Sequence, residues 1–107
     1  LHNIIPPEKP SLVHGDLWSG NFLVTPEGSP CLVDPAVYYG HREADIAMSL
    51  LFGGFEPGFY EVYNQTWPLE KGWQKRMDIF NLYPLLVHVN LFGGSYAGQV
   101  LRIIRQF

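Results

Sequence analysis

Apolar residues recur at helical intervals through most of the chain beyond position 43. In the first segment they lie three and four residues apart, as on one helix face, until Gly53-Gly54 ends the pattern. The third segment is the longest, and we expect a bend in it near Pro84. The four predicted helices cover residues 43–52, 57–67, 73–92 and 95–107.

Before position 43 the apolar residues form short runs instead of a helical pattern. Two such runs, FLV at 22–24 and CLV at 31–33, flank the sequence TPEG at 25–28. Proline at the second position and glycine at the fourth favour a type I turn, so residues 22–33 are predicted to form a β-hairpin. Together with the helices, this predicts an α+β fold that is mostly helical with one small β-hairpin.

The composition fits a single domain with more apolar surface than it can easily bury. The chain has 107 residues, of which 47% are hydrophobic and 16% are charged, whereas average proteins have roughly 25% charged residues. A chain of this length buries only about two-thirds of its unfolded surface. We therefore expect part of its apolar surface to face a neighbouring unit.

Charge and cysteine content argue against several classes of protein. The net charge is −3, and the seven lysines and arginines are scattered singly, which argues against a nucleic-acid partner. Cys31 is the single cysteine, so no disulfide forms within the chain. The sequence has no apolar run long enough for a membrane span and no signal-peptide pattern. These features favour a cytoplasmic protein with no membrane partner.

The sequence HGDLWSGN at 14–21 carries the strongest chemical signal. Asp16 precedes Asn21 by five residues, and Asp34 follows at the end of the predicted hairpin. In the kinase template for phosphoryl transfer, an Asp positions the attacking hydroxyl, and an Asn five residues later and a second Asp bind Mg²⁺. Because a hairpin returns the chain on itself, Asp34 is expected beside Asn21. The alternative is that Asp16 and Asn21 only cap turns and that Asp34, before Pro35, starts another turn.

Three stretches resemble the fructosamine kinases, also called ketosamine-3-kinases, within the aminoglycoside-phosphotransferase-like kinases. They are LVHGDLWSGNFLV at 12–24, CLVDPAVYYGHREADIAMSLLFGGF at 31–55 and LYPLLVHVNLFGGSYAGQVLRIIRQF at 82–107. The HGD sequence followed by Asn is shared by the larger group. The Trp-Ser-Gly in the loop and DPAVYYGHREADIAM are typical of the ketosamine kinases. The resemblance covers nearly the whole chain.

The resemblance implies roles for four residues of the phosphotransfer site. Asp16 would be the catalytic base that positions and deprotonates a sugar hydroxyl. Asn21 and Asp34 would hold Mg²⁺. Trp18 would offer its indole face to the sugar or to the amine-linked carbon chain, with ordinary packing as the alternative.

Further polar residues are expected to support this site or to lie near it. His14 is expected to brace the loop through hydrogen bonds and not to shuttle protons. Asp45 would accept backbone N–H bonds from the loop, or would only be favourable with the helix dipole. His88 lies among apolar residues and is expected to be a hydrogen-bonded core histidine. Four residues could either meet the substrate or be solvated loop residues: Tyr38, Tyr39, His41 and Arg42.

Kinases of this kind also need a lobe that covers the ATP phosphates and supplies a strand lysine. The chain has no glycine-rich loop between strands and no lysine in a hydrophobic strand. We therefore expect residues 1–107 to form the C-terminal lobe of a protein-kinase-like phosphotransferase, with the N-terminal ATP-binding lobe absent. Alone, such a lobe would bind Mg-ATP weakly or not at all and would be inactive.

The resemblance implies a function in ATP-dependent phosphorylation of a ketosamine at its third hydroxyl, which would serve the repair of glycated amines. The substrate would be a small-molecule or protein-linked ketosamine, and the cofactors would be ATP and Mg²⁺. One alternative is a kinase of another small alcohol, such as an aminoglycoside, choline or homoserine. An alternative of a different class is a non-catalytic, kinase-like interaction module.

Overall fold

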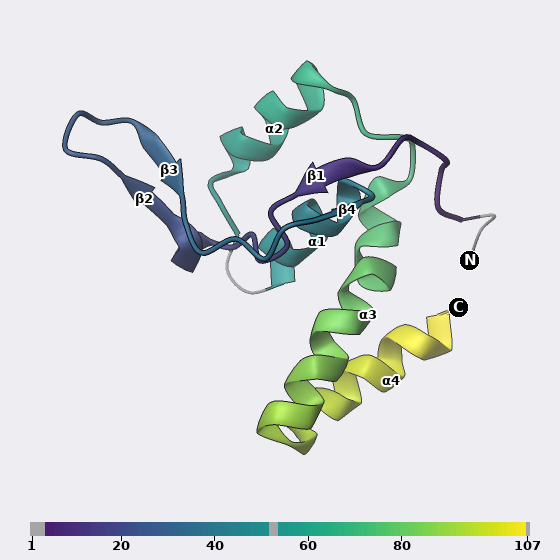
Figure 1. Ribbon diagram of the computed structural model, residues 1–107. Coiled ribbons are helices and arrows are strands. Elements are labelled where there is room, and N and C mark those ends of the chain that lie inside the picture. The colour runs from purple at the N-terminus through teal and green to yellow at the C-terminus, as the bar shows by residue number, and fades with distance from the viewer. Residues whose placement is uncertain (1–3, 52–53, 107) are drawn as a thin grey trace.

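The fold consists of four α-helices and two short antiparallel sheets in the computed structural model, which describes residues 4–51 and 54–106 (Figure 1). The helices are α1 (Glu43–Leu51), α2 (Pro57–Thr66), α3 (Trp73–Phe92) and α4 (Ala97–Gln106). The strands are β1 (Ser11–Val13), β2 (Phe22–Val24), β3 (Pro30–Leu32) and β4 (Tyr38–Gly40). A 3₁₀ turn at Ser19–Asn21 precedes β2, and a second 3₁₀ turn at Gly94–Tyr96 precedes α4. The predicted α+β class, mostly helical, is confirmed.

The helices begin close to the predicted positions. Pro57 is the first residue of α2, where its missing N–H removes no helical hydrogen bond. α3 continues through Pro84 to residue 92. Two predicted helix ends, at Gly53 and at Phe107, lie outside the described residues. No helix in the part of the chain that the structure describes is both long and apolar enough to cross a membrane.

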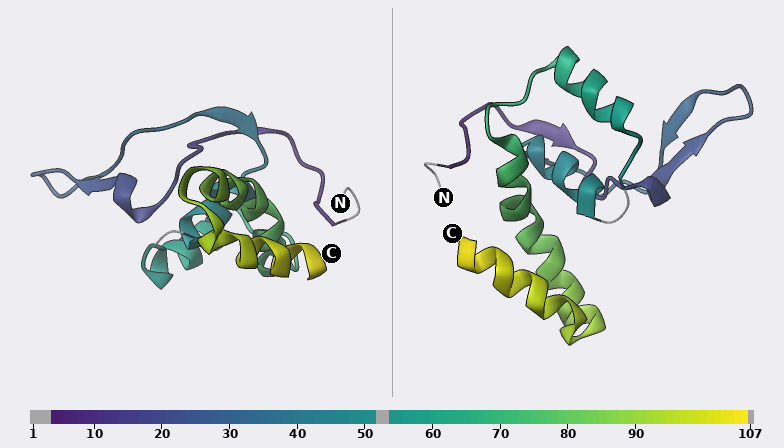
Figure 2. Two further views of the ribbon diagram at one scale, coloured as in Figure 1. Left: turned by 90° about the horizontal axis from the view of Figure 1, so that it is seen from below. Right: turned by 180° about the vertical axis from the view of Figure 1, so that it is seen from behind.

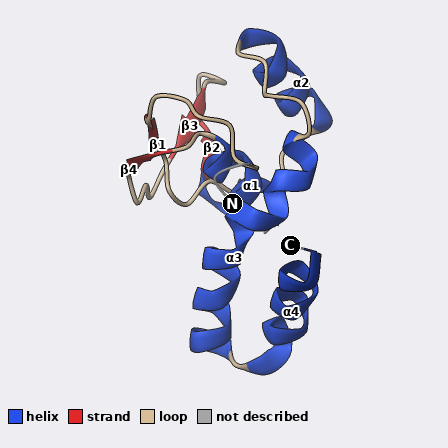
Figure 3. Ribbon diagram, turned by 90° about the vertical axis from the view of Figure 1, so that its right-hand side faces the viewer, coloured by secondary structure: helices blue, strands red, loops and turns tan. Residues whose placement is uncertain are grey.

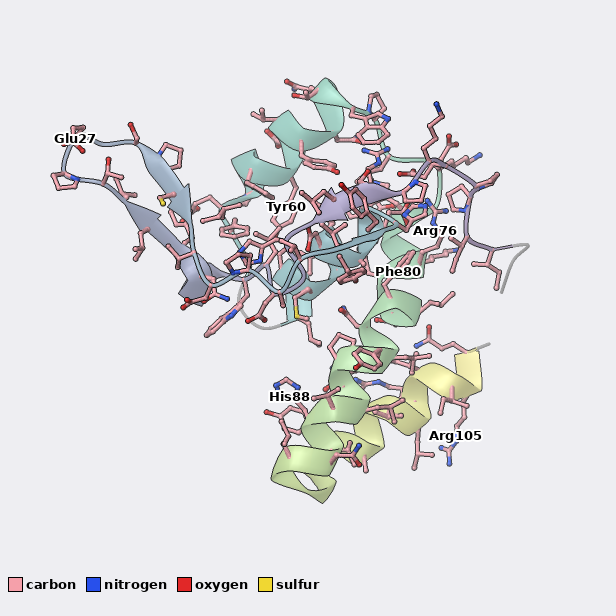
Figure 4. All side chains as sticks on the ribbon, viewed as in Figure 1. Glu27, Tyr60, Arg76, Phe80, His88 and Arg105 are labelled. Atoms are coloured by element: carbon pink, nitrogen blue, oxygen red, sulfur yellow. The ribbon has the colours of Figure 1, made fainter. Side chains whose placement is uncertain are left out.

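β2 and β3 form the predicted hairpin, with β3 one residue earlier than expected. The Gly28 N–H donates to the Thr25 carbonyl at 2.8 Å and closes the turn. Gly28 has a φ of +83°, which glycine adopts without strain. Every residue of both strands is exposed, and the hairpin extends away from the helices, with Glu27 at its tip (Figure 4).

β1 and β4 form a second antiparallel pair, which the sequence did not predict. Leu12 pairs with Tyr39, and Val13 pairs with Tyr38. Each strand has three residues, and the whole β2–β3 hairpin lies between them in the sequence. No short turn therefore signals this pairing locally. Its consequence is that Tyr38 lies beside the start of the HGDLWSGN loop.

The helices pack around two buried clusters that α3 connects. Figure 2 shows the strands on one side of the helices, and in Figure 3 α4 returns alongside the far half of α3. The first cluster joins α1 and α3 and includes tyrosines of α2, whereas the second joins α3 and α4. The buried residues are Ile46, Ala47 and Met77 in the first cluster, and Leu85, Val100 and Ile103 in the second.

A buried ion pair joins the start of α1 to the first turns of α3. Arg76 donates from Nε and Nη2 to the two carboxylate oxygens of Glu43, each at 2.8 Å. The Glu43 residue is 1% exposed, and Arg76 is 6% exposed. Arg76 also donates to the carbonyls of Lys71 and Glu70. The hydrogen bond to the Glu43 carboxylate raises the pKa of Arg76, and the two bonds fix α1 against α3.

Candidate functional site

The HGDLWSGN sequence forms the connection between β1 and β2, and α1 holds its first residues. Asp45, in the first turn of α1, accepts the His14 N–H at Oδ2 (2.7 Å) and the Gly15 N–H at Oδ1 (3.0 Å). A single carboxylate therefore fixes two consecutive peptide groups. Hydrogen bonds to an ionised acceptor are about twice as strong as neutral ones. The part that this contact plays in a reaction stays a prediction.

Replacing Asp45 by alanine is expected to free the two peptide groups that it holds. Each bond to a charged acceptor contributes about 1.5–3 kcal/mol, so the amides of His14 and Gly15 should exchange with solvent at least about 10-fold faster. Hydrogen–deuterium exchange resolved at single residues measures this rate. Replacing the exposed Glu61 of α2 by alanine is the control. Unchanged protection of both amides in the Asp45 variant would contradict the expectation.

The loop also packs directly on the segment that follows the hairpin. The Ala36 N–H donates to the His14 carbonyl at 2.8 Å. Gly15 has a φ of +88°, and a Cβ at this position would overlap the carbonyl oxygen of Ala36. Glycine is therefore required at position 15 both by its backbone conformation and by the close approach of the second segment.

The His14 side chain links the loop to the end of the hairpin. Its Nε2 lies 2.9 Å from the Val33 carbonyl, and its Nδ1 accepts the Asp16 N–H at 3.2 Å. A carbonyl only accepts, so we assign the proton to Nε2 and the lone pair to Nδ1. Both ring nitrogens are thus used in holding the backbone on either side of Asp16.

Asn21 is bound to Asp16 through two hydrogen bonds. Its Nδ2 donates to the Asp16 carbonyl at 2.9 Å and to the Asp16 carboxylate oxygen Oδ2 at 3.0 Å. Asn21 is buried, with 7% of its surface exposed. Both bonds are donated by the amide nitrogen, so they use none of the acceptor capacity of Oδ1. The carboxylate of Asp16 is held by one of its two oxygens.

Asp34 directly follows Val33, whose backbone pairs with Asn21 of the loop. The Val33 N–H donates to the Asn21 carbonyl at 2.9 Å, which extends the hairpin pairing by one position. Asp34 comes next in the chain, is exposed, and has a φ of +50°. A positive φ is uncommon for a residue other than glycine and often marks a functional position. The backbone therefore brings Asp34 next to Asn21, as the hairpin predicted.

The donor set at this place fits Mg²⁺ in its chemistry. The amide oxygen of Asn21 and the carboxylate of Asp34 are hard oxygen ligands, which Mg²⁺ prefers together with waters and phosphate oxygens. Among the described residues, no three His, Cys, Asp or Glu side chains form a metal-binding group. Mg²⁺ usually binds proteins through one or two carboxylates together with substrate phosphates, so a donor set this small is compatible with it.

Asp16 and Trp18 line a cleft of about 930 Å³ between the loop and α3. Tyr38 of β4 and Asp45 of α1 also line it, and the α3 wall is largely apolar. Phe80 and His88, which Figure 4 labels along α3, both belong to this wall. The Asp16 carboxylate thus faces an open cleft large enough for a sugar-sized molecule.

Comparison of the sequence with models of known protein families gives a match. The sequence model for the family described as Fructosamine kinase matches residues 5–107. The chain belongs to the fructosamine kinase family.

Curated relatives of this member of the fructosamine kinase family are themselves named as kinases. The chain is 56% identical over 98 residues to the probable ketoamine kinase of Enterococcus faecium, covering 92% of the chain and 35% of that protein. It is 44% identical over 99 residues to the chloroplastic protein-ribulosamine 3-kinase of Arabidopsis thaliana, covering 92% of the chain and 30% of that protein. The chain therefore spans about a third of the length of these relatives.

A solved structure agrees with the family assignment. The crystal structure of a candidate fructosamine-3-kinase from Thermobifida fusca superposes with a TM-score of 0.86 at 43% sequence identity. The superposition covers 97% of this chain and 36% of that protein. The resemblance to fructosamine kinases is confirmed, and the chain has the fold of the matching part of this structure.

The four residues at 38, 39, 41 and 42 divide among the cleft, the solvent and the protein interior. Tyr38 lines the cleft, whereas Tyr39 is 74% exposed. His41 Nε2 lies 3.1 Å from the Pro6 carbonyl. Arg42 is buried, lies over the Trp67 ring at 3.6 Å, and donates to the Trp67 carbonyl. Only Tyr38 of the four is placed to meet a ligand in the cleft.

His88 differs from the core histidine that the sequence predicted. Its Nδ1 donates to the Pro84 carbonyl at 2.8 Å, and its ring packs edge-on against Tyr96, as expected of a satisfied histidine. It is only half-buried, however, and lines the cleft. The sequence did not indicate this because the cleft forms only when α3 packs beside the loop.

Proposed function

We propose that this chain carries the catalytic loop of an ATP-dependent kinase that phosphorylates a ketosamine at its third hydroxyl, in the repair of glycated amines. The main support is the Asp16 carboxylate at the wall of the cleft, held by Asn21. Family membership supports the kinase class and the kind of acceptor. The names of the relatives, ketoamine kinase and protein-ribulosamine 3-kinase, support a sugar joined to an amine.

Asp16 acts as the general base in this proposal. The acceptor hydroxyl oxygen forms a bond to the γ-phosphorus of ATP while the bond from that phosphorus to its bridging oxygen breaks, and ADP leaves with that electron pair. The hydroxyl proton passes to the Asp16 carboxylate. The hydrogen bond from Asn21 to Oδ2 keeps the carboxylate at the cleft, which is the positioning that phosphoryl transfer needs.

Asn21 and Asp34 are the residues that would hold Mg²⁺. When bound, Mg²⁺ would neutralise negative charge on the ATP phosphates. The backbone bond between Val33 and Asn21 supports this assignment because it keeps the two ligand residues at neighbouring strand ends. That residues 1–107 form the C-terminal lobe of such a kinase also stays a prediction, and tests of activity use the full-length protein.

A panel of acceptors tests the function. The full-length protein, with Mg-ATP, is expected to phosphorylate synthetic fructosamines and ribulosamines, with the phosphate on the third hydroxyl as located by NMR of the product. Choline, homoserine and an aminoglycoside serve as acceptors for the alternative kinases. Turnover of one of these at a higher kcat/KM than every ketosamine would overturn the proposed substrate class. Absence of transfer to all acceptors would favour the interaction module.

A further inference from the structure

Two aromatic side chains of the cleft lie over glycines that follow them by two positions. A Cβ added to Gly20 would overlap the six-membered ring of Trp18, with Cζ3 only 2.7 Å away. A Cβ added to Gly40 would lie 2.7 Å from Cε2 of Tyr38. Carbon atoms in folded proteins do not approach so closely without displacement. Any side chain at either glycine would therefore push the ring away.

Local structure explains why each ring meets its glycine. The Asn21 N–H donates to the Trp18 carbonyl at 2.9 Å, and this closes a 3₁₀ turn that places Gly20 against the indole. Along a strand, residues two apart share a face, so Tyr38 and Gly40 lie on the same face of β4. The two contacts thus arise from different backbone conformations and are independent of each other.

The cleft that these rings line favours a positively charged ligand. Asp16 and Asp45 line it, and none of its described lining residues is a lysine or an arginine. Burial, and then the charge of Asp45, raise the pKa of Tyr38. Aromatic faces attract cations, more strongly where water is partly excluded.

We propose that Gly20 and Gly40 are positioning residues that hold the Trp18 and Tyr38 rings in the cleft, and that these two rings bind the ammonium group of a ketosamine. This inference rests on the proposed function. The amine of a ketosamine is protonated near neutral pH and lies on the carbon chain close to the third hydroxyl. Two aromatic rings lining the same cleft would therefore favour amine-linked sugars over neutral sugars of the same shape.

The variants Gly20→Ala and Gly40→Ala test this selection in the full-length protein. The acceptors are a fructosamine with an alkyl amine and its neutral N-acetylated counterpart. Loss of one cation–π contact is expected to raise KM for the amine by about 3- to 30-fold, with kcat within about twofold and little change for the neutral acceptor. Gly98→Ala is the matched control, because nothing lies within 4 Å of a Cβ there.

A double-mutant cycle separates positioning of the ring from general damage. If Gly20 acts through Trp18, then Gly20→Ala has no further effect on KM in a Trp18→Ala background. The same holds for Gly40→Ala in a Tyr38→Ala background. Additive effects in both cycles would overturn the inference, since they would mean that the glycines act on the fold and not through the rings.

Calorimetric binding without ATP distinguishes failure of this inference from failure of the proposed function. Equal dissociation constants of the wild-type protein for the amine and the neutral compound would overturn the inference, even if phosphorylation occurs. Tighter binding of the amine that the glycine variants lose, with no phosphate transfer by the wild type, would support the inference and overturn the proposed function.

Discussion

Replacing Asp16 by asparagine is expected to lower kcat on a ketosamine by on the order of 10²-fold or more, because an amide cannot take the hydroxyl proton. The loop should keep its structure, since Asn21 also donates to the Asp16 carbonyl, which the substitution leaves in place. Steady-state kinetics of the full-length protein measures the effect, and the melting temperature checks the fold.

The matched control for this substitution is Asp78→Asn in α3. Asp78 does not line the cleft, and its side chain accepts one hydrogen bond from Gln106. Its replacement should leave kcat near the wild-type value. If Asp16→Asn retained a kcat within threefold of wild type while Asp78→Asn behaved the same way, Asp16 would not be the base.

Replacing Arg76 by alanine is expected to give the largest loss of stability, about 3–5 kcal/mol in the free energy of unfolding. The substitution removes both bonds to Glu43 and leaves that carboxylate buried without a counter-charge. Urea denaturation of the full-length protein, followed by circular dichroism, measures the loss as a shift in midpoint.

Two further variants show whether the buried charge causes this loss. Arg105→Ala in α4 removes an arginine that is exposed (Figure 4) and should change stability by less than about 1 kcal/mol. Replacing both Glu43 and Arg76 by leucine removes the pair without leaving a lone charge, and should recover part of the stability. Equal losses in the single and double variants would show that side-chain packing, and not charge, dominates.

Local signals in the sequence predicted much of the fold. Pro57 gave the start of α2, because proline fits the first helical position. The turn at 25–28 gave the hairpin, and through it the placement of Asp34 beside Asn21. These features depend on residues close together in the chain. Their conformations can therefore be inferred before any tertiary contact is known.

Features that depend on distant segments were not predictable in the same way. The pairing of Val13 with Tyr38 has no hairpin signal, and strands of three residues are too short for a reliable alternation. The cleft forms only when α3 packs beside the loop. The sequence therefore could not indicate that Phe80 and His88 line it. Gly20 lies inside the motif, yet its contact with Trp18 depends on a ring orientation that composition does not reveal.

The first turn of α1 carries two carboxylates with different partners. Glu43 binds α3 through Arg76, and Asp45, two residues later, holds the peptides next to Asp16. Warming that loosens the contact between α1 and α3 should also move the loop that Asp45 holds, and with it the proposed base Asp16, relative to the α3 wall of the cleft. Loss of turnover on heating should therefore begin with the earliest loosening of this contact and precede global melting.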